Sequence, residues 1–126
     1  YSILVEHPAG SLLVYASAAF LPGALSAARA DAALLSLGSL GRRSLTFQNA
    51  YFDATAGATG ARVVYPIHHD DFTRPLGDRL RRMPWWMDDI PAALEALHAW
   101  AAARGVRVGE LQPWQPVRLL ETLESD

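Results

Sequence analysis

Residues 63–72 read VVYPIHHDDF, and the interpretation of the whole chain depends on how this stretch is understood. Its first five residues form an apolar run with the length of a β-strand, and such a run bounded by polar residues is typical of a buried strand. The run is followed directly by four side chains that can bind a proton or a metal ion: His68, His69, Asp70 and Asp71. This polar end has two interpretations, a solvated loop that caps the strand or one edge of an active site.

Outward from this strand, similar runs and turn signals divide the chain into strands and helices. Two β-rich runs around the Gly-containing turn 8–10 predict a hairpin, formed by residues 2–7 and 11–17. Further strands are expected at residues 31–38, 61–68 and 106–111. Helices are expected within residues 17–30 near Pro22, from residue 45 towards residue 60, and over residues 88–105. Asp88 or Asp89 can cap the last of these helices, Pro91 falls in its first turn, and Gly105 can end it.

The order of these elements, a hairpin followed by alternating helices and strands, predicts an α/β fold (α+β by some schemes) with mostly parallel pairing. The 126 residues have the length of one domain, so we expect residues 1–126 to form a single domain. In parallel sheets the ligand site lies beyond the carboxyl ends of the strands. Three of the expected strands end in small or polar residues, in the stretches YASAAF (15–20), LSLGSLG (35–41) and YPIHHDDF (65–72).

We therefore expect side chains from these three strand ends to meet at one edge of the sheet. The residues expected to line a substrate pocket there are Ser17, Phe20, Gly38 and Phe72. His68 is a candidate metal ligand or proton shuttle at the same edge, because histidine is the commonest neutral ligand and the usual shuttle near pH 7, and a solvated loop is the alternative. Asp70 and Asp71 lie within reach of the same edge and are the candidate catalytic carboxylates.

The composition limits the classes of partner and site that we expect. The net charge is −2, and all 11 basic residues are scattered arginines, so no nucleic-acid-binding stripe is expected. Because cysteine is absent, disulfides and thiolate metal sites are excluded, which is compatible with a reducing cytoplasmic location. No run of 18 apolar residues predicts a membrane span.

Taken in order, these stretches resemble the C-terminal half of a metallo-β-lactamase-fold hydrolase, in its bacterial lactonase-like branch. The stretch GATGARVVYPIHHDDF (57–72) is similar to the branch's last metal motif, which has a form such as P-x-H-W-D. LLVYASAAFLPG (12–23) is similar to the strand that ends at the third metal motif, and ADAALLSLGSLG (30–41) to a strand that ends in a Gly-containing loop. The resemblance implies the second half of an αββα sandwich, with His68 as the last histidine ligand of a zinc site.

Three departures from the family's pattern change what the resemblance implies. Ser17 stands where the family usually carries an aspartate that bridges two metals, which favours one metal over two. His69 stands where tryptophan is common in the branch. The principal H-x-H-x-D-H motif of the family's N-terminal half has no match in these 126 residues. Together with a start inside a strand, this leads us to expect a fragment or processed product that pairs with a missing N-terminal half or with a copy of itself.

The expected function is therefore part of a metal-dependent hydrolase with zinc, one or two ions, completed by ligands outside this chain. Its substrate would be a small molecule with an ester, lactone, amide or phosphoester bond. The alternative is a non-catalytic binding or assembly module with a degraded metal site. An upstream H-x-H-x-D-H motif in the reading frame would favour the enzyme, and a start codon just before Tyr1 would favour the module.

Overall fold

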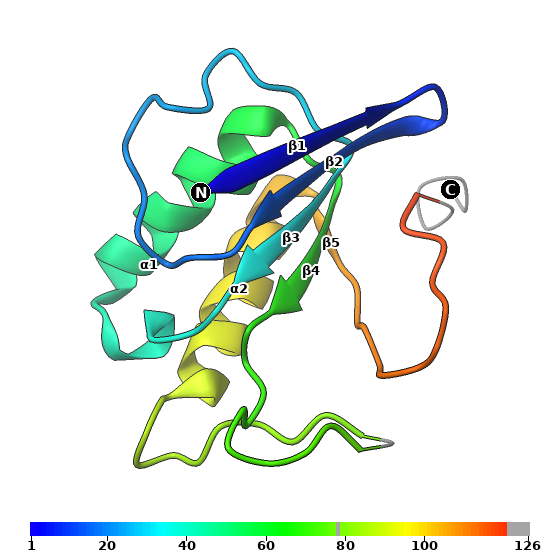
Figure 1. Ribbon diagram of the computed structural model, residues 1–126. Coiled ribbons are helices and arrows are strands. Elements are labelled where there is room, and N and C mark those ends of the chain that lie inside the picture. Colours follow the sequence, from blue (N-terminus) through cyan, green and yellow to red (C-terminus); the bar gives the residue numbers. More distant parts are fainter. Residues whose placement is uncertain (78, 121–126) are drawn as a thin grey trace.

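The computed structural model describes residues 1–77 and 79–120 and contains one five-stranded sheet (Figure 1). Its strands are β1 (Ser2–His7), β2 (Gly10–Tyr15), β3 (Ala32–Ser36), β4 (Val63–Ile67) and β5 (Arg107–Val108). They lie in the order β1-β2-β3-β4-β5, with β1 antiparallel to β2 and all other neighbours parallel. The predicted α/β class, the hairpin and the parallel strands are therefore confirmed, although β5 is shorter than the expected 106–111.

The helices begin and end at the residues that favour helix boundaries. The short 3-10 turn η1 (Leu40–Arg42) precedes α1 (Leu45–Phe52), which continues into the π-helical turn η2 (Asp53–Gly57). Ser44 caps α1 by accepting a hydrogen bond from the backbone of Phe47. The long helix α2 (Ile90–Arg104) is capped by Asp89 and ends at Gly105, which has a left-handed φ of 66°. Of the two candidate caps, Asp89 is thus the helix cap, and Asp88 is free for another role.

The prediction of a helix within residues 17–30 is wrong. This segment forms successive tight turns, with backbone hydrogen bonds such as Ala24 N to Leu21 O and Ser26 N to Gly23 O. Gly23 has a φ of 80°, outside the helical range. Most of the segment is exposed to solvent. A short helix needs an apolar face to pack, and this alanine-rich segment has little to bury, so its helical propensity does not decide its structure.

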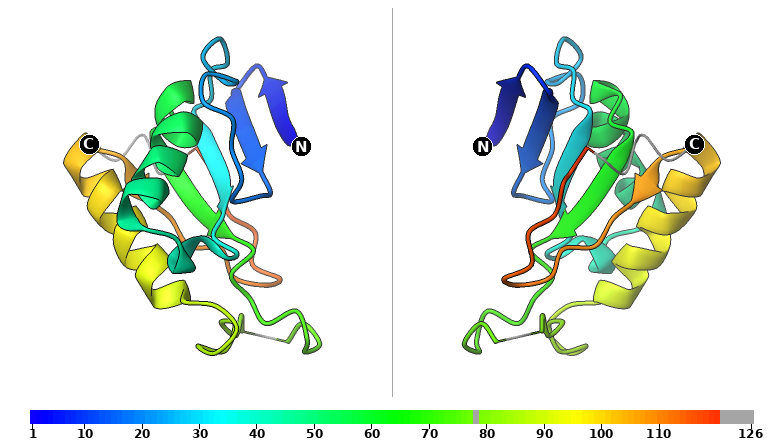
Figure 2. Two further views of the ribbon diagram at one scale, coloured as in Figure 1. Left: turned by 90° about the vertical axis from the view of Figure 1, so that its left-hand side faces the viewer. Right: turned by 90° about the vertical axis from the view of Figure 1, so that its right-hand side faces the viewer.

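The helices of the described residues lie on one face of the sheet (Figure 2). The side chains of the main core pack between these helices and the sheet. Tyr51, Phe52 and Trp100 are almost fully buried there, and their rings contact one another in sequence at centroid distances of 5.5 and 5.6 Å. Trp100 Nε1 donates a 2.8 Å hydrogen bond to Asp53 Oδ1, so its polar atom is satisfied at the edge of the core. This core joins α1, η2 and α2 to the strands.

The opposite face of the sheet is also apolar, and no helix of the described residues covers it. The register places Val5, Leu12, Ala32 and Val63 in one row across four strands, and Ile3, Val14, Leu34 and Tyr65 in the next. Leu119 and Leu120 from the C-terminal segment pack against part of this face. At the β1 edge, Ile3 and Val5 remain 59% and 47% exposed. One face of the sheet is therefore closed by helices, and the other is only partly covered.

Candidate functional site

The backbone of His68 is strained where it follows β4. His68 has a φ of 54°, in the left-handed region that residues with a Cβ rarely adopt. Its Nδ1 atom lies 3.1 Å from the hydroxyl oxygen of Ser36, the fully buried last residue of β3. The other ring nitrogen, Nε2, has no partner among the described residues. The side chain is thus oriented by the neighbouring strand, with one nitrogen left available at the carboxyl edge of the sheet.

Gly38 allows this histidine to lie against the loop that follows β3. A Cβ atom at Gly38 would lie 2.9 Å from His68 Nδ1 and 3.1 Å from the carbonyl oxygen of His68. These distances are shorter than ordinary contacts, so a side chain at position 38 would displace the imidazole. Glycine is needed at position 38 because the backbone there lies close to His68. Gly38 lines the pocket as a result of this packing.

The carboxylate of Asp88 is the site feature that the sequence analysis missed. Asp88 is only 7% exposed, and its Oδ2 accepts a 2.6 Å hydrogen bond from the backbone N–H of Ser39, which has a left-handed φ of 66°. The second oxygen, Oδ1, is buried and has no hydrogen-bond partner among residues 1–77 and 79–120. Buried carboxylate oxygens are normally paired, so the unpaired Oδ1 calls for a partner such as a bound water or a ligand. The sequence signal was the pair Asp88-Asp89, of which only one can cap α2.

Two pockets meet at His68, and His68, Gly38 and Ser39 line both of them. The first, which we call the Arg43 pocket, has a volume of about 510 Å³ and is lined by residues 16–20, Ser36, Gly38, Ser39, Arg43, Phe47 and His68. The second, the Asp88 pocket, has a volume of about 180 Å³ and is lined by Gly38, Ser39, His68, Asp70, Phe72, Met83, Met87 and Asp88. The structure therefore brings Ser17, Phe20 and Gly38 together with His68 on one side, and Asp70 and Phe72 with His68 on the other.

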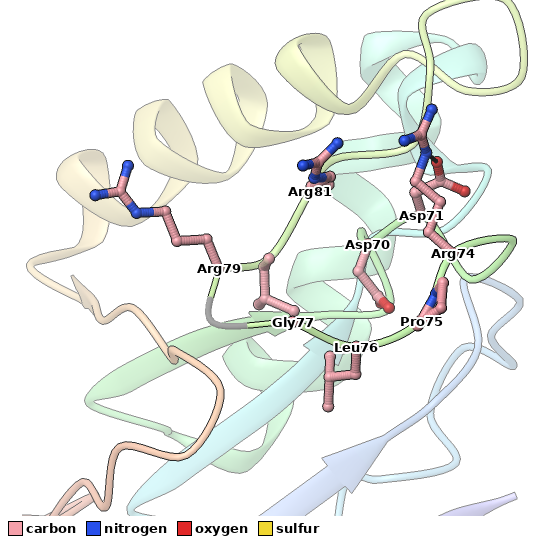
Figure 3. A pocket seen from close by; sticks show the side chains of 9 residues that line it. Asp70, Asp71, Arg74, Pro75, Leu76, Gly77, Arg79 and Arg81 are labelled. Carbon is pink, nitrogen blue, oxygen red and sulfur yellow. Dashed lines mark ion pairs between the residues drawn. The ribbon is translucent and has the colours of Figure 1, made fainter.

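Asp71 lies apart from these two pockets. Its carboxylate accepts hydrogen bonds from the backbone and hydroxyl of Thr73 and forms a 3.3 Å ion pair with Arg74 (Figure 3). These contacts, the Thr73 hydroxyl foremost, hold the pKa of Asp71 below its ordinary value. With Asp70 it lines a third pocket of about 560 Å³ in the 70–81 loop. Because its oxygens serve its own turn, its position supports a structural role, and of the two predicted carboxylates only Asp70 borders His68.

His69 occupies a different environment from His68, although the two are adjacent in sequence. Its Nδ1 is buried and has no hydrogen-bond partner in the described part of the chain. Burial is the main cause that lowers the pKa of His69, so the neutral imidazole is favoured near pH 7. It lines a separate pocket of about 370 Å³ with His98 and Glu110. The two histidines therefore line different pockets.

The residues near His68 do not make a complete metal site by themselves. Among residues 1–77 and 79–120, no group of three or more His, Cys, Asp or Glu side chains is arranged to hold a metal ion. A tight zinc site needs three or four ligands. His68 with Asp70 or Asp88 supplies at most part of that set.

Comparison of the chain with protein-family models, with curated proteins and with solved structures finds no match in any of the three. Within the described residues, no helix has both the length and the apolar character needed to cross a lipid bilayer.

Proposed function

We propose that this chain forms one wall of a metal-dependent hydrolase site, as the second half of an αββα metallo-β-lactamase sandwich. The observation that carries the proposal is His68, which is held in a left-handed conformation at the carboxyl edge of the sheet and whose Nε2 has no partner among residues 1–77 and 79–120. Strained non-glycine residues persist where function requires their geometry. Parallel sheets place their ligand sites at this edge.

The residues around His68 suit a role as a metal ligand. If Nδ1 carries the ring proton and donates it to Ser36 Oγ, the lone pair of Nε2 points away from the protein scaffold that fixes the ring. A divalent ion such as zinc, when bound, supplies Lewis-acid activation of water for attack on an ester, lactone, amide or phosphoester. Asp70 and Asp88, which border His68, would orient that water or accept its proton. With Ser17 in place of a bridging aspartate, one metal is proposed, in a cytoplasmic protein that acts on a small molecule.

The half-covered sheet face supports the proposal that the remaining ligands come from outside this chain. In a sandwich of two sheets, helices cover the outer faces and the inner faces pack together. Here the helices occupy one face, and the rows Val5-Leu12-Ala32-Val63 and Ile3-Val14-Leu34-Tyr65 make the other face apolar. Exposed apolar patches of this kind mark interfaces. The proposed partner is an N-terminal half that carries an H-x-H-x-D-H motif, or a second copy of this chain.

A second candidate is a non-catalytic binding or assembly module with a degraded metal site. Its support is that the described residues contain no metal-holding group of three or more side chains. The same apolar sheet face would then serve assembly alone. The two proposals differ in what they require of His68, because only the hydrolase requires its Nε2 to bind a metal.

The test is a zinc titration of the chain, followed by nitrogen-15 NMR of its imidazole side chains. We expect weak binding in which Nε2 of His68 is the most strongly shifted ring nitrogen, because its ring is already oriented. His98→Gln is the control, since His98 is exposed on α2 and outside the two His68 pockets. Tight zinc binding that survives His68→Ala, or a titration in which His68 does not respond, would contradict the metal assignment and favour the module.

A further inference from the structure

The Arg43 pocket contains one permanent positive charge and no acidic side chain. Its lining consists of alanines, serines, Gly38, Phe20, Phe47, His68 and Arg43. A pocket lined by one sign of charge raises the local concentration of ligands with the opposite charge. The pocket is therefore electrostatically prepared for an anion, directly beside the histidine of the candidate site.

The guanidinium of Arg43 is not used in an internal ion pair. In the described part of the chain, arginines 62, 74 and 104 each pair with an aspartate, while Arg43 has no acidic partner. Its guanidinium lies over the Phe47 ring, whose centroid is 4.0 Å from the Arg43 Cζ atom. Stacking on an aromatic face restrains the planar guanidinium, and its N–H donors have no acceptor among the described residues. Such a group binds carboxylate or phosphate oxygens with two parallel hydrogen bonds.

An apolar wall lies next to this cation. The rings of Phe20 and Phe47 pack at 5.3 Å, and both line the pocket. The hydroxyl oxygen of Ser17 accepts a hydrogen bond from the backbone of Ala19, so its hydroxyl proton can be donated to a ligand. The pocket thus combines a cation and a hydroxyl donor with aromatic surface.

From this arrangement we infer that the Arg43 pocket binds a small anion that joins a carboxylate or phosphate group to an apolar portion. Arg43 holds the anionic group, Phe20 and Phe47 contact the apolar portion, and the ligand extends towards His68. The statement that this ligand is the substrate rests on the proposed hydrolase function, and it narrows the substrate to an anionic ester, lactone, amide or phosphoester. Binding of the anion itself requires neither the metal nor the reaction.

The experiment measures binding of phenyl phosphate and of phenylacetate to the metal-free chain, by calorimetry and by NMR. Benzyl alcohol is the neutral ligand of similar shape. We expect both anions to bind and to shift the resonances of His68 and Phe47, and benzyl alcohol to bind at least about tenfold more weakly, as loss of a charge-assisted hydrogen bond implies. The anion with the higher affinity identifies the preferred group, and binding should weaken as salt is added.

The matched variants are Arg43→Gln and Arg42→Gln. Arg42 carries the same charge one residue away, but its Nη2 donates to the carbonyl oxygen of Trp86 and it does not line the pocket. Arg43→Gln should weaken both anions about tenfold or more, and Arg42→Gln should change affinity less than about twofold. Circular dichroism of both variants checks that the chain is still folded, and Arg43→Lys should retain part of the affinity.

Equal binding of the neutral and anionic ligands, or an Arg43→Gln variant with unchanged affinity, would overturn the anion site. These outcomes are separate from failure of the hydrolase proposal, because the titrations contain no metal. Anion binding at Arg43 without any zinc response at His68 would support the pocket and count against the metal. A zinc response at His68 without anion binding would support the metal and count against the anion pocket.

Discussion

The polar groups at the two ends of the central strands β3 and β4 differ in how completely they are hydrogen-bonded. At the amino end, Asp31 accepts hydrogen bonds from the backbone and hydroxyl of Ser11, at 2.8 and 3.1 Å, and pairs with Arg62 at 3.1 Å. Both oxygens of this carboxylate have protein partners. At the carboxyl end, Asp88 has one oxygen bound to the backbone of Ser39 and one buried oxygen without a partner in the described chain.

The backbone shows the same difference. The described residues contain three non-glycine positions with positive φ, and two of them, Ser39 and His68, line the pockets at the carboxyl end. The third is Trp114, in the C-terminal segment. Strain and unsatisfied polar atoms both reduce stability, and they persist together where geometry serves a ligand. The polar groups at the amino end therefore serve the structure, and we expect the functional residues at the carboxyl end.

The largest expected effect comes from Gly38→Ala, which tests whether the carboxyl end is tightly packed around His68. The added methyl group would lie 2.9 Å from His68 Nδ1, so the imidazole and its loop must move. We expect a loss of about 1–3 kcal/mol in the free energy of unfolding, as in other overpacked sites. Urea denaturation measures it, and Gly77→Ala is the control, because a Cβ there meets no atom within 4 Å. Equal losses of stability from the two substitutions would show that Gly38 is not tightly packed against His68.

The next largest effect is expected from Asp31→Asn, at the amino end of the central strands. The substitution removes the charge that Arg62 and the Ser11 donors stabilise, and we expect a loss of about 1–2 kcal/mol at neutral pH, measured by urea denaturation. The hydrogen bond from the Ser11 backbone is the main cause that holds the pKa of Asp31 below its ordinary value.

That pKa shift predicts the pH dependence of the same comparison. A carboxyl group whose pKa is lowered by folding stabilises the protein above its unfolded pKa, about 4, and loses this contribution as the pH falls through the folded value. The difference between wild type and Asp31→Asn should therefore be full at pH 6 and shrink below about pH 4. A difference that stays constant from pH 6 to pH 3 would contradict the role of the charge.

A smaller change in the free energy of unfolding is expected from Asp88→Asn at the carboxyl end. Asparagine can still accept the hydrogen bond from Ser39, and the change removes a buried charge whose second oxygen is unpaired. We expect a change of less than about 1 kcal/mol, smaller than for Asp31→Asn although Asp88 is more deeply buried. A loss above about 2 kcal/mol, measured in the same denaturation series, would show that Oδ1 is satisfied and that the two ends are alike.

The smallest effect on stability is expected from His68→Asn. Asparagine tolerates the left-handed backbone better than histidine does, so relief of strain should offset the lost contact with Ser36. We expect a change within about 0.5 kcal/mol, with the zinc response of the chain abolished. A loss comparable to that of Gly38→Ala would mean that His68 is held for folding and would remove the main support for a functional edge.

Much of the fold could be predicted from sequence because its signals are local. The apolar runs of the strands, the Pro-Ala-Gly turn of the hairpin and the residues Asp89, Pro91 and Gly105 around α2 act within a few positions of the structure they define. The helix expected near Pro22 failed for the complementary reason. Its alanines favour a helix locally, but the segment remains mostly exposed and gains no packing energy to hold one.

The candidate site was predictable in part. The expectation that the strand ends containing Ser17, Gly38 and His68 meet followed from parallel pairing, and these residues do line one pocket. The separation of Asp70 from Asp71 was not predictable, because it depends on the turn in which Thr73 and Arg74 engage Asp71. Nothing in the sequence alone indicated that the charge of Arg43 would face the same pocket.

The sequence by itself determined the order of the elements, the class of the fold and the edge of the sheet at which polar groups gather, because spacing and pairing rules act along the chain. Only the tertiary structure decided which polar atoms are satisfied. Asp31 meets Ser11 across 20 residues, and Asp88 meets Ser39 across 49, with one oxygen left over. Whether both oxygens of a carboxylate have partners depends on such long-range contacts, and these form only when the chain has folded.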